Sequence, residues 1–251
     1  MAEIRIVLVE PSHPGNIGAV ARAMMNMSLR SLVLVRPRQF PHPEANARAS
    51  GAEAVLAGAR VVESVREAVA GCGFIAATTS RERDQYFRVL EARAAAPRIV
   101  LESERTPAAI LFGAERTGLT NEEIERSHVL VRIPADGAYA SLNLAMAVQI
   151  MAYELFLARA ERAKGSGAAP EKARVTPLAT PQEMERLEHH LAEVMEEVGF
   201  RDRTQSGTHL MGRIRRFLQR AELDQNEANI LRGLLTAIQQ RRRQAGAPPE
   251  S

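Results

Sequence analysis

Two loop segments far apart in the sequence carry uncharged side chains that can donate and accept hydrogen bonds. The first spans 10–18 and holds Asn16, and the second spans 133–147 and holds Ser141 and Asn143. Each follows an apolar run and leads into an expected helix. In α/β proteins, ligands bind where the carboxyl end of a strand meets the next helix. We therefore predict that the two loops form one site.

Arg22 follows the first loop by about one helical turn, within the otherwise apolar run Ala19-Val-Ala-Arg-Ala-Met-Met25. Arginine is rare on an apolar helix face unless it has a partner or a function. Its guanidinium binds phosphate and stabilises developing negative charge. A surface salt bridge is the alternative role for Arg22. Helix capping is the alternative role for Asn16 and Asn143, and it is compatible with catalysis.

Several common functional motifs are absent from the sequence. Gly15 and Gly18 do not complete the G-x-G-x-x-G pattern, and the run 31–35 ends in Arg-Pro-Arg instead of an acid that would bind a ribose. The P-loop and the G-x-S-x-G elbow are also missing. Cys72 is the single cysteine, so an internal disulfide and a cysteine-based zinc site lack partners. We expect no nicotinamide cofactor and no metal.

Apolar runs alternate with helix-like segments up to residue 162. We expect strands at 4–9, 31–35, 60–62, 73–78, 108–112 and 128–133. We expect helices at 17–26, 45–57, 64–70, 93–102, 121–126 and 143–162. Thr120-Asn-Glu-Glu123 has the pattern of a capping box, which places a helix start near residue 121. Such alternation is typical of the α/β class, with a parallel sheet covered on both faces.

The segment Lys164-Gly-Ser-Gly-Ala-Ala-Pro170 interrupts this pattern and indicates a domain boundary. We predict a first domain at 1–163, a linker at 164–179 and a small all-helical domain at 180–245. Three apolar helix faces support the all-helical domain. Their expected core positions are Leu187, Leu191, Val194, Met195 and Val198 on the first helix, Leu210, Ile214, Phe217 and Leu218 on the second, and Ile230, Leu231, Leu234, Leu235 and Ile238 on the third.

The composition fits a protein with a substantial core and no membrane span. The chain has 251 residues, of which 45% are hydrophobic, and no run approaches the roughly 18 apolar residues that a membrane helix needs. Nothing at the N-terminus resembles a secretory signal, so we expect a cytoplasmic location.

Arginines cluster in the expected helical domain. The segment 201–220 contains six arginines and one acid, and Arg241-Arg-Arg243 follows near the C-terminus. Such a cluster suits RNA phosphates. A solvated helix face is the alternative reading.

Three motifs together resemble the SpoU branch of the SPOUT RNA methyltransferases. They are Pro14-Gly-Asn-Ile-Gly18 with Arg22, Leu111-Phe-Gly-Ala-Glu-Arg-Thr-Gly-Leu-Thr120, and Ile133-Pro followed by Ser141-Leu-Asn-Leu-Ala-Met-Ala147. The segments Thr78-Thr-Ser-Arg-Glu-Arg83 and Asn229-Ile-Leu-Arg-Gly-Leu-Leu235 are similar to those tRNA 2′-O-methyltransferases of the branch that act at nucleotide 32 of the anticodon loop. The resemblance covers almost the whole chain.

The resemblance implies S-adenosylmethionine as methyl donor, a deep trefoil knot in the first domain and a homodimer. Small apolar helix faces at 19–25 and 144–148 are the expected dimer contacts. The implied donor-binding residues are Thr78, Thr79, Ser80, Gly113, Ile133, Ala140, Ser141 and Leu142. Gly113 is expected to permit a close approach of the adenosine. Ala114 departs from the family, where a larger residue is common, and we expect it to alter only the pocket rim.

The resemblance also makes Arg22 the central catalytic residue, with Asn16, Ser141 and Asn143 holding the ribose and the loops. Arginine has a pKa above about 12, so we expect Arg22 to anchor a phosphate and stabilise the alkoxide instead of acting as the base. Glu115 is expected to brace the knot or the dimer interface. The expected RNA-binding residues are Arg81, Arg83, Tyr139, Arg213, Arg215 and Arg216, and Tyr139 has packing as its alternative role.

The resemblance therefore implies a dimeric tRNA ribose 2′-O-methyltransferase that acts on C or U at nucleotide 32. One alternative is a 2′-O-methyltransferase for another tRNA position or for rRNA. The helical tail argues against it, since rRNA-directed relatives usually carry an N-terminal extension instead. A second alternative is a non-catalytic RNA-binding protein on the same scaffold, but such a protein would be expected to lose Arg22 or Asn16.

Overall fold

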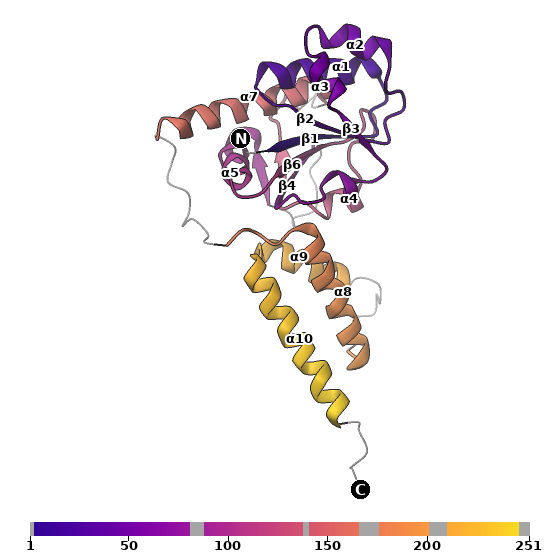
Figure 1. Cartoon of the computed structure of the whole chain (residues 1–251), viewed down its shortest axis with the longest axis vertical. Helices are drawn as coiled ribbons and strands as arrows, with labels where there is room; N and C mark the ends of the chain where they lie inside the picture. The colour runs from indigo at the N-terminus through magenta and orange to yellow at the C-terminus, as the bar shows by residue number, and fades with distance from the viewer. Residues whose placement is uncertain (1–2, 81–87, 138–140, 166–175, 201–209, 246–251) are drawn as a thin grey trace. The chain divides into compact units, whose positions relative to one another are not determined.

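The computed structural model describes residues 3–80, 88–137, 141–165, 176–200 and 210–245. The predicted residues Arg81, Arg83, Tyr139 and Ala140 lie outside these ranges. The chain divides into two compact units, Met1–Arg174 and Val175–Ser251. Each unit is described by itself, with the elements labelled as in Figure 1.

A parallel sheet forms the centre of the first unit. Its strands are β1 (Ile4–Val9), β2 (Ser31–Val35), β3 (Arg60–Val62), β4 (Phe74–Thr78), β5 (Val89–Glu91), β6 (Ala108–Phe112) and β7 (Val129–Arg132). Within the described residues the seven strands are ordered β3-β2-β1-β6-β4-β7-β5, and all neighbouring pairs are parallel. The predicted α/β sheet is confirmed. The sequence pattern missed β5, a short edge strand whose residues are exposed or half-buried.

The helices of the first unit are α1 (Pro14–Asn26), α2 (Pro43–Ala49), α3 (Glu53–Ala57), α4 (Val65–Ala68), α5 (Ala92–Ser103), α6 (Asn121–Ile124) and α7 (Leu144–Ala163). The prediction of one helix at 45–57 is wrong. Ser50 and Gly51 have φ values of +45° and +93°, and this left-handed turn separates α2 from α3. The predicted capping box is confirmed, because Thr120 and Glu123 exchange hydrogen bonds at the start of α6.

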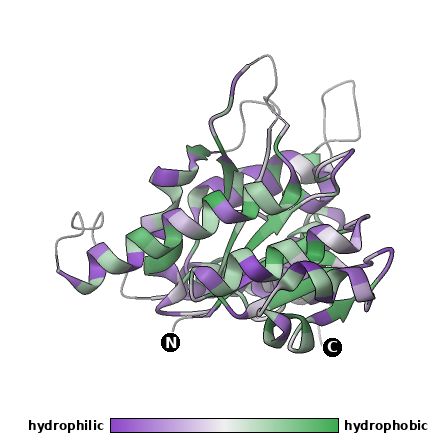
Figure 2. Ribbon diagram, turned by 90° about the horizontal axis from the view of Figure 1, so that it is seen from above, coloured by the Kyte–Doolittle hydropathy of each residue, from purple (hydrophilic) through white to green (hydrophobic). Residues whose placement is uncertain are grey.

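Helices cover both faces of the sheet (Figure 1). On one face, Val65 of α4 and Ile124 of α6 pack into a core cluster with alternate strand residues such as Val7, Val33 and Ile75. On the other, α1 packs against α2 and α7, and α7 packs against α5. The central strands β1, β2, β4 and β6 are almost entirely buried, as expected for a sheet covered on both sides, and the strand segments visible in Figure 2 are mainly hydrophobic.

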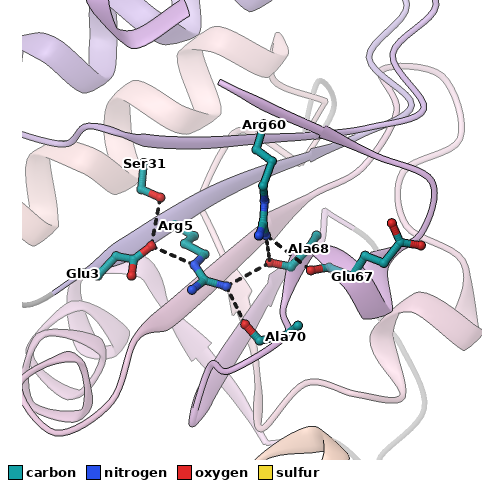
Figure 3. A network of polar contacts seen from close by, with 7 residues as sticks. All are labelled: Glu3, Arg5, Ser31, Arg60, Glu67, Ala68 and Ala70. Carbon is teal, nitrogen blue, oxygen red and sulfur yellow. Dashed lines mark hydrogen bonds and ion pairs between the residues drawn. The ribbon is translucent and has the colours of Figure 1, made fainter. Parts of the chain in front are cut away.

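Two arginines of the sheet hold the carbonyl end of α4 (Figure 3). Arg5 donates to the carbonyl oxygens of Ala68 and Ala70 at 3.4 and 2.6 Å, and Arg60 donates to that of Ala68 at 3.3 Å. Glu3 accepts a hydrogen bond from Arg5 at 2.8 Å, and this bond lowers the pKa of Glu3. Cations at a helix C-terminus donate hydrogen bonds to the unpaired carbonyl groups and interact favourably with the negative end of the helix dipole. These arginines therefore have a structural role.

The second unit consists of α8 (Pro181–Glu197), α9 (Leu210–Ala221) and α10 (Gln225–Ala245). Its buried core is formed by Ala179, Leu187, Val194, Leu218, Ala228 and Leu235. Thr180 and Glu183 form a capping box at the start of α8, and Gly199, with φ of +67°, follows its end. The predicted helical tail is confirmed.

Three expected core positions of α10 are not in this core. Leu231 and Leu235 pack inward, but Ile230, Leu234 and Ile238 are exposed. Phe217 of α9 and Val198, the residue after α8, are also exposed. Hydrophobic periodicity identifies two apolar faces on α10. It does not indicate which of the two packs into the core of the unit.

Gly18 of α1 allows α1 and α2 to pack closely. A Cβ atom at this position would lie 2.1 Å from the carbonyl oxygen of Ala45. We expect Gly18→Ala to lower the free energy of unfolding by about 1–3 kcal/mol, the usual cost of overpacking. Urea unfolding measures the change. Gly58→Ala is the control, because its Cβ would meet nothing closer than 3.4 Å. Equal stability of both variants would contradict this account.

Candidate functional site

A cavity of about 360 Å³ lies at the carboxyl ends of β4, β6 and β7. Thr78 ends β4, Gly113 follows β6 and Ile133 follows β7, and all three line the cavity. The Thr78 hydroxyl donates to the carbonyl of Leu111 at 2.9 Å, and the Thr79 amide donates to that of Val131 at 2.9 Å. These bonds attach the start of the loop after β4 to both neighbouring strands. The cavity therefore has the position typical of ligand sites in parallel sheets.

The structure brings the predicted donor-binding segments together. The lining residues include Thr78, Thr79, Ser80, Gly113, Ile133, Ser141 and Leu142. Ala140 belongs to the same predicted set and lies outside the described residues. The wall opposite is formed by 114–119, with Leu144 and Ala147 of α7 completing the lining. The role of these residues in binding a donor stays a prediction.

Gly113 serves a close approach between two parts of the backbone. A Cβ atom here would lie 2.2 Å from the carbonyl carbon of Gly118 and 2.3 Å from the amide nitrogen of Leu119. The loop folds back because the Gly118 amide donates to the carbonyl of Ala114 at 2.8 Å. Gly113 was expected to make room for a ligand. In the structure it first makes room for this turn, which forms one cavity wall.

A chain of hydrogen bonds joins three loops at the edge of the cavity. Asn143 Nδ2 donates to Asn16 Oδ1 at 3.1 Å, and Asn16 Nδ2 donates to Glu115 Oε1 at 2.9 Å. Glu115 Oε2 accepts from the amide and the hydroxyl of Ser12 at 3.0 and 2.9 Å. The two loops that the sequence placed in one site are thus in contact, and Glu115 is the residue that connects the second motif to them. We refer to Ser12, Asn16, Glu115 and Asn143 as the loop network.

Glu115 is a charged acceptor within this network. Burial raises the pKa of a carboxyl group, but the hydrogen bonds from Asn16 and Ser12 outweigh it and hold the pKa of Glu115 below its usual value. An ionised carboxylate accepts hydrogen bonds and donates none. Glu115 therefore fixes the orientation of the Asn16 amide, whose oxygen faces Asn143.

The two asparagines differ in their relation to helix ends. Asn143 is the N-cap of α7 and accepts from the amides of Ala145 and Met146 at 2.9 and 3.4 Å. Its capping role and its place in the loop network coexist. Asn16 lies within the first turn of α1, whose N-cap is His13. The interpretation of Asn16 as a mere cap is therefore wrong.

Arg22 lies on α1 with an exposed side chain, between the buried residues Ala21 and Ala23. It does not line the cavity. Toward the part of the chain that the structure describes, Arg22 makes neither a hydrogen bond nor an ion pair, so the salt-bridge alternative does not hold. Its guanidinium is available to an anion from outside the unit.

The predicted RNA-binding arginines of α9 are not equivalent. Arg213 is exposed. Arg215 is half-buried and pairs with Glu188 of α8 at 2.9 Å, so it also holds α8 and α9 together. Arg216 is half-buried as well. Arg220, at the end of the same helix, is exposed.

Sequence reasoning missed the role of Ser12 and the contacts of Glu115 with Ser12 and Asn16. The expectation that Glu115 braces the knot or the dimer interface stays a prediction. A signal for Glu115 existed, since it is the acid of the second motif and lies between Gly113 and Gly118. No comparable signal marks Ser12. Within the described ranges, no group of three or more metal-ligating side chains occurs and no helix is long and apolar enough to cross a membrane.

Comparison with known proteins assigns both units. Residues 3–153 match the model described as the SpoU rRNA methylase family. Residues 182–247 match the model of the C-terminal domain of the tRNA methyltransferase TrmJ.

Two curated relatives are similar over nearly their full length. The tRNA (cytidine/uridine-2′-O-)-methyltransferase TrmJ of Sodalis glossinidius is 42% identical over 248 residues, which cover 99% of this chain and 96% of the relative. The tRNA (cytidine/uridine/adenosine-2′-O-)-methyltransferase TrmJ of Pseudomonas aeruginosa is 44% identical, with coverages of 94% and 93%.

Solved structures agree with this relationship. The crystal structure of TrmJ from Z. mobilis ZM4 has a TM-score of 0.78 at 33% identity, and the match covers 95% of this chain and 100% of that one. An AdoMet-bound rRNA methyltransferase from Sinorhizobium meliloti has a TM-score of 0.51 at 25% identity, with coverages of 63% and 56%. A structure concerned with 2′-OH methylation of C/U34 on tRNA has a TM-score of 0.51 at 26% identity, with coverages of 65% and 98%.

The first family model spans more than half of the chain, and relatives above 40% identity align over almost all of it. The resemblance seen in the three sequence motifs is therefore confirmed, and the chain belongs to the SpoU rRNA methylase family.

Proposed function

We propose that this protein is a cytoplasmic, S-adenosylmethionine-dependent tRNA 2′-O-methyltransferase that acts as a homodimer on the ribose of C or U at nucleotide 32. The observation that carries the proposal is the cavity and the loop network beside it, where all three family motifs meet. The names of the full-length relatives support the substrate and the reaction.

The cavity suits a nucleoside-sized donor. Its volume of about 360 Å³ lies within the usual range for ligand pockets. Apart from Glu115 and Arg116, the side chains of its walls are small or apolar. Such walls read an uncharged adenine through amide and carbonyl groups. Bound S-adenosylmethionine supplies an electrophilic methyl group on a sulfonium. Ser141 lines the cavity beside Leu142 and is placed to orient the acceptor ribose.

The protein's contribution to the rate is mainly positional. A ribose 2′-hydroxyl is a weak nucleophile, and correct placement of two reactants is worth about 7–11 kcal/mol. The loop network fixes the first and third motifs against each other. The distance and orientation between the bound ribose and the bound methyl donor are therefore maintained. Arg22, unpaired toward the described residues, binds the phosphate next to the target ribose and stabilises the developing alkoxide.

The presence of the helical second unit supports nucleotide 32, and not another tRNA position, as the target of methylation. The match to the C/U34-related structure covers 98% of that chain but only 65% of this one, so about a third of this chain has no counterpart there. The Z. mobilis TrmJ structure matches 95% of this chain. A loop nucleotide must be splayed into the site, and one pocket cannot select it without contacts elsewhere on the RNA.

Exposed apolar side chains on α7 support a homodimer. Val20, Ala23 and Val148, on the helix faces expected to pair, are buried in the unit's own core. Met146, Ile150, Tyr153 and Phe156 of α7 are exposed instead. A contiguous exposed apolar face on a helix is a typical interaction surface, and we propose that a second copy covers it.

We expect the protein to methylate tRNA at nucleotide 32, and Arg22→Ala to lower the single-turnover rate by at least about a hundredfold, as loss of transition-state charge stabilisation does. The affinity for the donor, measured by calorimetry, should stay within about twofold, since Arg22 does not line the cavity. Nuclease digestion and mass spectrometry locate the product. Arg93→Ala, an exposed arginine on α5, is the control and should keep full activity. Methylation at another nucleotide, or an active Arg22→Ala enzyme, would contradict the proposal.

Glu115→Gln should weaken the loop network, because an amide has one acceptor oxygen where the carboxylate has two. We expect at least a tenfold loss of turnover, as is usual when a positioning group is lost, on the order of 1.4 kcal/mol in barrier. In the folded protein, the pKa of Glu115 is below the ordinary glutamate value of 4.5, because Asn16 and Ser12 donate hydrogen bonds to the carboxylate. The stability that ionisation contributes is therefore present above pH 4.5 and is lost as pH falls through the lower folded pKa.

The matching measurement is urea unfolding of both proteins at pH 7 and at acidic pH. The wild type should be more stable than Glu115→Gln at pH 7, and the difference should shrink below pH 4.5. A difference independent of pH would show that the Glu115 charge does not stabilise the fold.

The exposed arginines of α9 provide a test of tRNA binding by the second unit. We expect Arg213→Gln with Arg220→Gln to weaken tRNA binding and to reduce the salt dependence of the binding constant by about two in slope, one for each lost phosphate contact. Arg215 is left intact because it pairs with Glu188. Arg30→Gln with Arg93→Gln removes the same charge from the first unit and is the control. Equal effects of the two pairs would assign the α9 arginines to a solvated surface.

A further inference from the structure

Helix α10 has a second apolar face that the core of its unit does not use. Ala228, Leu231 and Leu235 pack inward. On another side, Ile230, Leu234 and Ile238 are 70%, 58% and 39% exposed. These three residues are spaced by four and so lie along one side of the helix. We call them the α10 strip.

Small residues beside the strip leave room for a partner helix. Gly233 has no heavy atom within 4 Å of the place where a Cβ would be, and Ala237 is exposed. Small residues at a helix surface let a second helix approach closely, so that large neighbours such as Leu234 can interdigitate. The shape of this side of α10 therefore suits another helix.

The charges at the two ends of the strip are opposite. Glu227 precedes Ile230 and Arg241 follows Ile238, and both charged side chains are exposed. Glu227 and Arg241 are each seven positions from Leu234, and Ile230 and Ile238 are each four positions from it. The pattern is therefore symmetric in position and opposite in charge about Leu234.

This symmetry matches an antiparallel pair of identical helices. With Leu234 facing Leu234, each Ile230 faces the other chain's Ile238, and each Glu227 faces the other chain's Arg241. A parallel pair in register would instead bring Glu227 to Glu227 and Arg241 to Arg241. Flanking charges of this kind decide partner and direction in helix pairs. The strip lacks the aromatic side chains that stack on bases, which argues against RNA as its occupant.

We propose that the α10 strip docks antiparallel against the α10 strip of a second copy of this chain. One helix pair of this length buries less than the roughly 1,200 Å² of a stable interface, so free C-terminal units should associate weakly. Chains already joined through their first units would present the two strips at about millimolar effective concentration. That strengthening rests on the proposed homodimer, whereas the contact itself does not depend on methyl transfer.

The native cysteine does not interfere with a test of this contact by disulfide cross-linking. Cys72 is buried, and burial raises the pKa of its thiol to about 11, so it reacts slowly with oxidants and alkylating reagents. A cysteine introduced at position 234 is then the reactive thiol of the full-length chain. Thr236→Cys is the matched control, because Thr236 is exposed on α10 but lies on the opposite side from Leu234.

Mild oxidation of the full-length protein should link Leu234→Cys chains into covalent dimers at least about tenfold faster than Thr236→Cys chains, as expected when the thiols are held together and not merely tethered. Direction is tested by mixing Glu227→Cys chains with Arg241→Cys chains. The mixture should form a 227–241 link, identified by mass spectrometry, while each variant alone should link poorly.

Three outcomes would overturn the proposal. Equal rates at 234 and 236 would show only random collisions, and 227–227 or 241–241 links would show a parallel pair. Protection of Leu234→Cys from a small alkylating reagent without any link would show that another part of the same chain covers the strip. None of these positions lines the cavity, so methylation by the reduced variants reports the proposed function separately.

Discussion

The site depends on one ionised carboxylate that accepts three hydrogen bonds from two other residues. Glu115 contacts Ser12 and Asn16, and Asn16 in turn contacts Asn143. Without this chain of bonds, three loops from distant parts of the sequence would share an edge of the sheet but no fixed geometry. Because charge-assisted bonds are stronger than neutral ones, the bonds that Glu115 accepts hold the loop of the second motif against that of the first more firmly than neutral bonds would.

Sheet topology explains why these loops meet. The order β1-β6-β4-β7 puts strands from the first and second halves of the unit next to one another, and all of them run in the same direction. Each motif follows one of these strands, so every loop leaves at the carboxyl edge. Backbone contacts then set the distance between the loop segments. At Gly113, for example, the chain turns so that the backbone of 118–119 lies directly against this glycine. A side chain at Gly113 would displace the wall that carries Glu115.

Much of the first unit could be predicted from its sequence, because a strand buried on both faces is a continuous apolar run. The motifs also placed the cavity-lining residues in one group. The predictions that failed did so for different reasons, one distant in sequence and two local. The partner of Asn16 is 99 residues away, the division of helix 45–57 depends on the backbone at Ser50 and Gly51, and β5 is too short and exposed to leave a pattern. In the second unit, both faces of α10 are apolar, and the sequence does not say which one is covered from within. The trefoil knot stays a prediction, since periodicity carries no information on threading.

The arginines show why total charge says little about function. The formal net charge is only +3, and many of the arginines are committed to the fold. Arg5 and Arg60 hold α4, and Arg215 joins α8 to α9. Arg22, Arg213 and Arg241 are exposed, and toward the described residues they have no partner. In this interpretation each meets a different anion outside its own unit, which is the target phosphate for Arg22, the tRNA body for Arg213 and a second copy's Glu227 for Arg241. Total charge therefore does not distinguish an arginine that holds the fold together from one that is open to an external anion, whereas the partner of each guanidinium group does.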